Sequence, residues 1–183
     1  RIGSKIPYFK GIRPGIEEAK TMAAAMAASG SVAMFHVEGV TPESKKFDIS
    51  ELETMHIGQK EIKEAYERLN TADDVQLIAL GCPHLTEKEM HEIASLLRGK
   101  KKKSDTEIWF CTSKTVRDRC SEDVRVMERF GPVLADTCMV VAPIEETFSK
   151  TGTNSCKAAN YLPTLCSQRV MCQDIKELLK VIQ

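Results

Sequence analysis

Seven cysteines are spread along this chain of 183 residues, and two of them stand where a thiolate could bind a metal. Cys138 lies within Ala-Asp-Thr-Cys-Met-Val-Val, and Cys172 precedes the last expected helix, whose backbone N–H groups would favour a thiolate. The C-x-x-C spacing of zinc ribbons and thioredoxin-like redox sites does not occur. A metal site must therefore combine distant positions. On composition alone, a cysteine in an apolar strand is more often a small core residue.

The polar stretch from Thr151 to Lys157 is a candidate site for an anion. It places hydroxyls, an amide and a cation directly before a run of helix-forming residues. This order is typical of an anion-binding loop that enters a helix, with Asn154 and Ser155 as donors and Lys157 as the counter-charge. An ordinary N-cap followed by a solvated lysine fits the same residues.

Two histidines are candidates for acid–base or hydrogen-bonding roles. His84 follows Gly-Cys-Pro between an expected strand and an expected helix, where a neutral imidazole could donate to a substrate oxygen. A loop histidine whose ring bonds to the backbone is an equal alternative. His36 and Glu38 are two residues apart, so they point to one face of their expected strand and would each pair with something there.

Helices and short apolar strands are expected to alternate along the chain. The expected helices cover residues 15–29, 57–70, 87–98, 116–130 and 174–181, and the expected strands cover residues 31–40, 75–81, 106–113 and 133–143. The first helix would end at Gly30 and pack on both sides, and Thr86 with Glu89 has the capping-box spacing. This alternation predicts an α/β fold of three layers, α/β/α, with a mostly parallel sheet. In such sheets, chemistry gathers at the loops that leave the carboxyl ends of the strands.

Composition limits the class of protein. Lys plus Arg and Asp plus Glu are both 26, so no overall field would collect nucleic acid or an anionic membrane. No apolar run approaches the roughly 18 residues of a spanning helix, and the scattered, odd-numbered cysteines indicate reduced thiols in the cytoplasm. The length predicts a single α/β domain over residues 1–183. Because the chain opens on Arg1 rather than Met, we expect it to be a fragment of a larger protein.

Four segments, taken in chain order, resemble a known family. They are AAMAASGSVAMFHVEGVTPE, IALGCPHLTEKEMHEIASLL, ADTCMVVAPI and TNSCKAANY followed by Cys172. Together they are similar to the large subunit of the aconitase X group of dehydratases, over nearly the whole chain. The resemblance implies a fold like the aconitase iron–sulfur domains, with this chain as the carboxyl-terminal part of the large subunit.

The resemblance also implies an iron–sulfur cluster, with 4Fe–4S the expected type. Cys138 and Cys172 match two ligand positions, the third cysteine ligand belongs to an upstream segment outside this fragment, and Cys82 is a further candidate. The family's catalytic base is a serine of a small swivelling-domain subunit. That subunit and the N-terminal remainder of the large subunit are the expected partners, so the fragment alone would be inactive.

Around the cluster, the resemblance raises His84 to a catalytic candidate and Asn154, Ser155 and Lys157 to substrate-binding candidates. The chain departs from the family pattern at two positions nearby. Cys156 stands where a small apolar residue is more common, and Asn160 stands where a histidine is more common. These departures bear on the contacts with the substrate.

The reaction implied is the dehydration of a small hydroxy acid, with 5-phosphomevalonate of the archaeal mevalonate pathway as the expected substrate. The chain ends soon after Cys172, where a fused enzyme would continue into its small domain, and this favours the type with separate subunits. Dehydration of cis-3-hydroxy-L-proline is the alternative within the family. A non-catalytic α/β binding or scaffold domain and a structural zinc site are alternatives outside it.

Overall fold

A five-stranded parallel sheet forms the centre of the larger part of the molecule. The structure, a computed structural model, describes residues 2–183, so Arg1 lies outside the described residues. The strands of this sheet are β3 (Leu77–Leu85), β4 (Glu107–Thr112), β5 (Val133–Ala135), β6 (Lys150–Thr153) and β7 (Arg169–Cys172). Their order is β5-β4-β3-β6-β7, and every neighbouring pair is parallel. The predicted parallel α/β sheet is confirmed.

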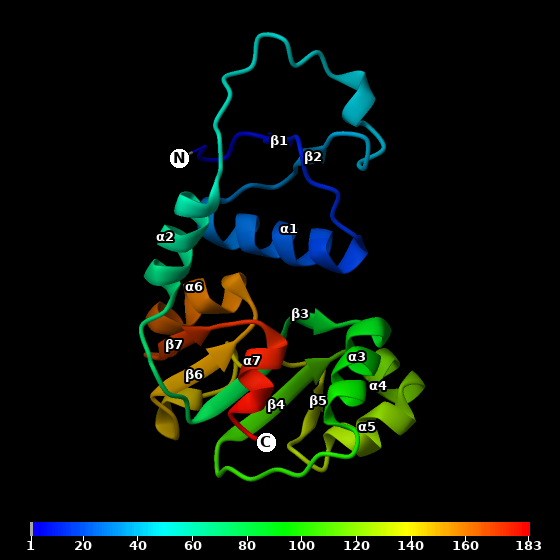
Figure 1. The fold of residues 1–183 in the computed structure, drawn as a ribbon, viewed down its shortest axis with the longest axis vertical. Coiled ribbons are helices and arrows are strands. Elements are labelled where there is room, and N and C mark those ends of the chain that lie inside the picture. Colours follow the sequence, from blue (N-terminus) through cyan, green and yellow to red (C-terminus); the bar gives the residue numbers. More distant parts are fainter. Residues whose placement is uncertain (1) are drawn as a thin grey trace.

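The strand order reverses beside the central strand β3. From β3 the chain moves outward through β4 to β5, and it then returns to the other side of β3 to form β6 and β7 (Figure 1). Helices that connect strands on opposite sides of such a reversal lie on opposite faces of the sheet. Open α/β sheets bind their ligands at the carboxyl ends of the strands beside such a reversal, and we call this region, at the ends of β3 and β6, the crevice.

Two apolar clusters, one on each face, hold the layers together. On one face, side chains of β3 and β4 pack against four helices: α3 (Glu87–Leu97), α4 (Lys114–Arg119), α5 (Ser121–Met127) and α7 (Ile175–Lys180). On the other face, they pack against α6 (Cys156–Leu165) and the loop over residues 138–148, which includes the short 3-10 helix η2 (Ile144–Glu146). Alternate residues of β3 serve the two clusters, and each buried Leu or Ile contributes about 1.5–3 kcal/mol.

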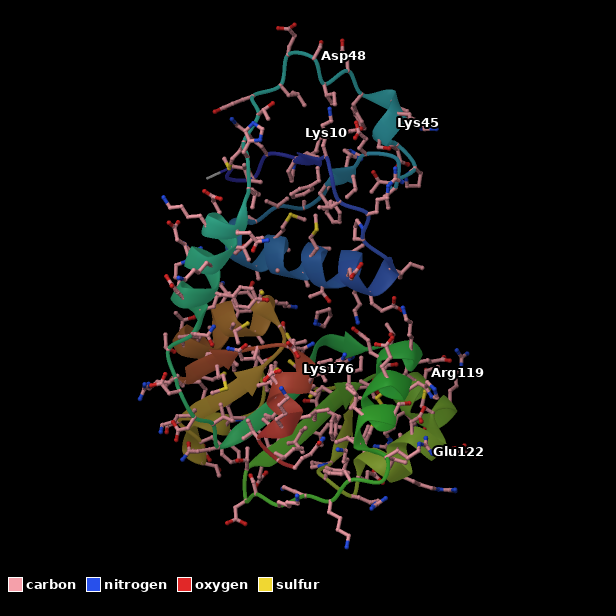
Figure 2. The ribbon with its side chains drawn as sticks, in the orientation of Figure 1. Lys10, Lys45, Asp48, Arg119, Glu122 and Lys176 are labelled. Atoms are coloured by element: carbon pink, nitrogen blue, oxygen red, sulfur yellow. The ribbon has the colours of Figure 1, made fainter. Side chains whose placement is uncertain are left out.

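The first seventy residues form a separate layer. It consists of β1 (Tyr8–Phe9) paired in parallel with β2 (His36–Val37), α1 (Ile16–Gly30), the 3-10 helix η1 (Ser44–Lys46) and α2 (Gln59–Leu69). In Figure 1, α1 lies between the small sheet and the larger part, and it contacts α6 and β3. Figure 2 shows Lys10, Lys45 and Asp48 at the outer end of this layer. Within residues 2–183, no helix is long and apolar enough to cross a bilayer.

Two expectations for the N-terminal layer were met only in part. We predicted that the first helix packs on both sides; α1 does lie between the small sheet and the larger part (Figure 1), but none of its fifteen residues, all of them described, is buried. We also predicted a buried strand over residues 31–40, whereas only His36 and Val37 pair in β2. Left-handed backbone at Ser31 (φ 55°) and Gly39 (φ 70°) interrupts an extended path on both sides of this pair.

Expectations for the larger part were wrong at three places. The single helix predicted over residues 116–130 is broken at Cys120 into α4 and α5, so that side chains of both helices reach the same cluster. The strand predicted over residues 133–143 stops at Ala135, because Asp136 adopts a left-handed conformation (φ 56°). Strands β6 and β7 were not predicted, since they are only four residues long and carry polar residues.

The capping box of α3, by contrast, was predicted and is present. The Thr86 hydroxyl accepts from the Glu89 N–H at 3.2 Å, and the Glu89 carboxylate accepts from the Thr86 N–H at 2.8 Å. Replacing Thr86 by alanine should lower the free energy of unfolding by about 1 kcal/mol. Thr164→Ala, at an exposed threonine that bonds only within α6, is the matched control and should change it by less than about 0.5 kcal/mol. Equal urea midpoints for the two variants would contradict the capping role.

Candidate active site at the carboxyl ends of the strands

A bulge at the end of β3 places the first site residues. Leu80 pairs with Phe110 and Leu85 pairs with Thr112, so β3 has three more residues than β4 between these two points. Gly81 begins the bulge with φ 103°, and a Cβ there would lie 2.0 Å from the Cys111 carbonyl oxygen. Residues 82–85, which lie between the predicted strand 75–81 and the predicted helix 87–98, are therefore part of β3. The bulge turns the buried Cys82 toward the cluster that contains α6.

His84, at the end of this bulge, is tied to the loop that carries Cys138. Its Nε2 lies 2.8 Å from the Thr137 carbonyl oxygen, the residue before Cys138. From the other side, Lys20 of α1 donates to the His84 carbonyl at 2.9 Å and forms an ion pair with Glu89. The ring of His84 is thus bonded to the backbone through Nε2, as the alternative to a catalytic role had predicted. Its Nδ1 makes no hydrogen bond within residues 2–183. A catalytic role for His84 stays a prediction, with Nδ1 as the atom that would perform it.

Cys138 lies in a tight loop. We had predicted it within a strand over residues 133–143, and that prediction was wrong. The Asp136 N–H donates to the Thr112 carbonyl at 2.9 Å, and its carboxylate accepts from the Lys114 N–H at 3.0 Å. This loop brings the half-buried Cys138 close to two buried thiols, Cys82 and Cys111. Burial raises the pKa of Cys111 to about 12, and the nearby Cys138 adds to the shift. Cys111 is therefore a protonated core thiol.

The first turn of α6 faces the same crevice. Ser155 is its N-cap, 3% exposed, and the Ser155 hydroxyl accepts from the Ala158 N–H at 3.0 Å. Burial raises the pKa of Cys82, while the positive charge of Lys157 and a hydrogen bond with Ser155 oppose that shift. Lys157 forms no ion pair with any described residue. The N-cap role predicted as the alternative for Ser155 is therefore present, next to an uncompensated cation.

Cys172 ends β7 and is in contact with Cys156. It stands opposite Thr153 in the β6–β7 pair, and Cys156 begins α6 only three residues after Thr153. The two thiols share a hydrogen bond, which lowers the pKa of Cys156 and raises that of Cys172. The pair therefore loses its first proton more readily than an isolated thiol, and the second less readily.

These contacts connect the predicted cysteines through the crevice. Cys138 lies near Cys82, Cys82 bonds to Ser155, and the residue after Ser155 touches Cys172. Both predicted ligands therefore stand at the same end of the sheet. Among residues 2–183, however, no three His, Cys, Asp or Glu side chains are grouped closely enough to hold a metal ion. The donor chemistry fits an iron–sulfur cluster only if a ligand from outside this chain completes the set.

His36 and Glu38 do not join this site. Glu38 forms an ion pair with Lys10 at 3.8 Å, with both side chains exposed. His36 is 7% exposed, its ring centroid lies 4.5 Å from that of Phe47, and its Nδ1 has no hydrogen-bond partner among the described residues. The two side chains thus serve separate contacts in the N-terminal layer.

Two residues of the site region were not found from the sequence. Lys20 reaches the His84 carbonyl from α1, and Asn70, just after α2, bonds to the backbone of Cys172. Each contact joins residues more than sixty positions apart. No local pattern in the chain indicates such contacts, because a surface lysine and an asparagine after a helix are ordinary residues in those places.

Comparison with known proteins gives the family. The model of the aconitase X third domain matches residues 75–182, and that of the aconitase X second domain matches residues 1–67. The phosphomevalonate dehydratase large subunits of Methanocaldococcus jannaschii and Methanothermobacter thermautotrophicus are 42% and 40% identical. These alignments cover 96% and 97% of this chain but only 45% and 46% of those proteins.

More distant relatives agree in sequence and in structure. The cis-3-hydroxy-L-proline dehydratase of Hypocrea jecorina is 33% identical over 91% of this chain and 31% of its own length. The crystal structure of Thermococcus kodakaraensis aconitase X in its holo-form has a TM-score of 0.91 at 34% identity, covering 99% of this chain and 48% of that one. The chain spans less than half the length of these relatives. With family models matching almost its full length, and as its four resembling segments indicated, the chain belongs to the aconitase X family.

Proposed function

We propose that this chain is part of the large subunit of an iron–sulfur hydro-lyase that dehydrates 5-phosphomevalonate to anhydromevalonate phosphate. The carrying observation is the 40–42% identity to phosphomevalonate dehydratase large subunits along almost the whole chain. The hydroxyproline dehydratase relative is less similar, at 33% identity. The parallel sheet, with its thiols gathered at the strand reversal, is consistent with a site for such chemistry.

Cys138 and Cys172 would hold the cluster, of the 4Fe–4S type, together with a third cysteine from the part of the subunit outside this chain. Supporting this assignment, both thiols lie at the carboxyl ends of the strands, and Cys82 and Ser155 connect them. A bound cluster with one open iron would supply a Lewis acid for the departing hydroxyl. Cys82, a buried thiol close to Cys138, remains the further candidate ligand.

The first turn of α6 would bind an anionic group of the substrate. Its free N–H groups and the positive end of the helix dipole favour a phosphate or carboxylate there. Lys157 is available as the counter-charge because it has no acidic partner among residues 2–183. Asn154, whose side chain makes no hydrogen bond in the described chain, and the Ser155 hydroxyl would orient the group, and His84 Nδ1 would face the reacting end.

A small swivelling-domain subunit would supply the serine base, and the N-terminal remainder of the large subunit would supply the third ligand. In support, several relatives are named large subunits and are about twice as long as this chain. We place the enzyme in the cytoplasm. All seven cysteines are free, as a reducing compartment requires.

The test is anaerobic reconstitution of the full large subunit with its small subunit, followed by dehydration assays on 5-phosphomevalonate and cis-3-hydroxy-L-proline. We expect turnover of the phosphorylated substrate, with kcat/KM at least about 100-fold above that for hydroxyproline, equivalent to about 2.7 kcal/mol of transition-state binding. The reverse preference would support the hydroxyproline alternative. A complex that turns over neither substrate and binds no iron would support the scaffold alternative.

A further inference from the structure

Cys172 lies on the outer edge of the sheet, where one side of the strand lacks a neighbouring strand. On its inner side, β7 pairs with β6, and the Gln173 N–H donates to the Thr153 carbonyl at 3.1 Å. On its outer side, the Cys172 backbone would present an open N–H and an open carbonyl. The end of an edge strand with such open groups is the part of a sheet that frays most readily.

The side-chain amide of Asn70 closes this open side. The Cys172 N–H donates to Asn70 Oδ1 at 2.8 Å, and Asn70 Nδ2 donates to the Cys172 carbonyl at 3.2 Å. One side chain therefore bonds both backbone groups of one residue, as a neighbouring strand would. The amide is itself anchored, because Asn70 Nδ2 also donates to the Tyr66 carbonyl at the end of α2 at 2.8 Å.

The contact continues along β7 through the next residues of the same segment. The Thr71 and Ala72 N–H groups both donate to the Val170 carbonyl, at 2.8 and 3.0 Å, and the Thr71 hydroxyl accepts from the Val170 N–H at 2.8 Å. Segment 70–72 thus pairs with the outer edge of β7 at two points. Thr71 holds the strand two residues before Cys172, and Asn70 holds Cys172 itself.

We propose that Asn70 is a positioning residue that fixes Cys172 for binding the cluster. The inference rests on the proposed role of Cys172 as a ligand. Iron–sulfur ligation is short and rigid, so a ligand on a fraying strand end would lose its geometry, and the amide prevents this. Asn70 lies outside both matched family regions, which end at residue 67 and begin at residue 75, so the junction of the two regions holds the ligand.

The experiment uses the full large subunit with its small subunit, reconstituted anaerobically, with Asn70→Ala, Asn70→Asp and Thr71→Val as variants. Thr71→Val is the matched control, because it removes a hydrogen bond of the same 2.8 Å length to the same strand without touching Cys172. We measure bound iron, visible absorbance, and the rate at which a chelator removes the cluster. Asn70→Ala should release the cluster about 10–100-fold faster than the wild type. Thr71→Val does not contact Cys172, so this variant should release the cluster at a rate within about 3-fold of the wild-type rate.

Equal release rates for Asn70→Ala and Thr71→Val, or a wild-type rate for Asn70→Ala, would overturn the positioning role. If Asn70→Ala does not fold, Asn70→Asp decides, because it keeps the acceptor for the Cys172 N–H but opposes a carboxylate to two carbonyls. Its release rate should exceed that of Thr71→Val, and equality would overturn the proposal. Cys172→Ser, run in parallel, separates the two hypotheses. If it keeps a full cluster, the ligand assignment fails, whereas the wild-type assay alone tests the proposed reaction.

Discussion

Replacing either Cys138 or Cys172 by serine should abolish the visible absorbance of the cluster in the full large subunit. A serine oxygen is a harder donor than a thiolate and is a poor ligand for iron–sulfur clusters. Turnover should fall by more than the roughly 100-fold that marks the upper end of indirect effects on a metal site. Absorbance and iron content after anaerobic reconstitution are the measurements, with far-ultraviolet circular dichroism to confirm that the fold is kept.

Other cysteines of the chain provide the controls. Cys120, between α4 and α5, packs among apolar side chains on the face of the sheet opposite to α6. Cys120→Ser should therefore keep the full iron–sulfur cluster. Cys82→Ser tests the further candidate thiol and should also keep the iron–sulfur cluster, because the family resemblance places the ligand positions at Cys138 and Cys172. Full cluster content in both the Cys138 and the Cys172 variants would refute the ligand assignment. Loss of the cluster in Cys82→Ser would move the ligand role to the bulge of β3.

Replacing Gly81 by alanine should destabilise the protein by about 3 kcal/mol or more. Two costs combine at this position. A φ of 103° is strained for any residue with a Cβ, and the added Cβ would meet the Cys111 carbonyl oxygen at 2.0 Å, which the packed sheet cannot avoid without shifting β4. The urea midpoint of the large subunit measures the loss, and the shift of the bulge should also weaken cluster binding.

Gly99→Ala is the matched control for Gly81→Ala. Gly99 also has a positive φ, 76°, but nothing lies within 4 Å of the position that its Cβ would occupy. It should therefore show only the cost of backbone strain, about 1 kcal/mol. If the two variants lose the same stability, the close approach of β3 and β4 at Gly81 contributes nothing, and the account of the bulge is wrong.

The sequence predicted those parts of the fold that strong local signals determine. The capping box at Thr86 predicted α3 close to its observed bounds, and the apolar run ending at Gly81 predicted the first half of β3, which extends four residues further. The two outer strands on the β6 side were missed because KTGT and RVMC are too short and polar to differ from loops. Their identity as strands comes from pairing with β3 and with each other, and local sequence does not encode this pairing.

The same division applies to the candidate site. The transition from strand to helix around His84 and the start of a helix after Ser155 could be placed from the sequence, because turn and cap residues mark them. The strand order brings residues from five strands to the carboxyl-terminal end of the sheet. The contacts of Cys82 with Ser155 and of Cys156 with Cys172 depend on this order. The family resemblance supplied the pair Cys138 and Cys172 without explaining it. The contact between Asn70 and Cys172, 102 positions apart, was beyond any local reading.

Helix α1, which lies over the candidate site without a buried residue, determines how the protein should respond to the salt concentration. Its ties to the larger part include two ion pairs, Lys20 with Glu89 and Lys88 with Glu17, and none of its side chains is buried. Charges at partly exposed positions are screened over about 10 Å at 0.1 M salt and over about 3 Å at 1 M. Rising ionic strength should therefore loosen this cover over the carboxyl ends of the strands, while the apolar clusters below it are unaffected.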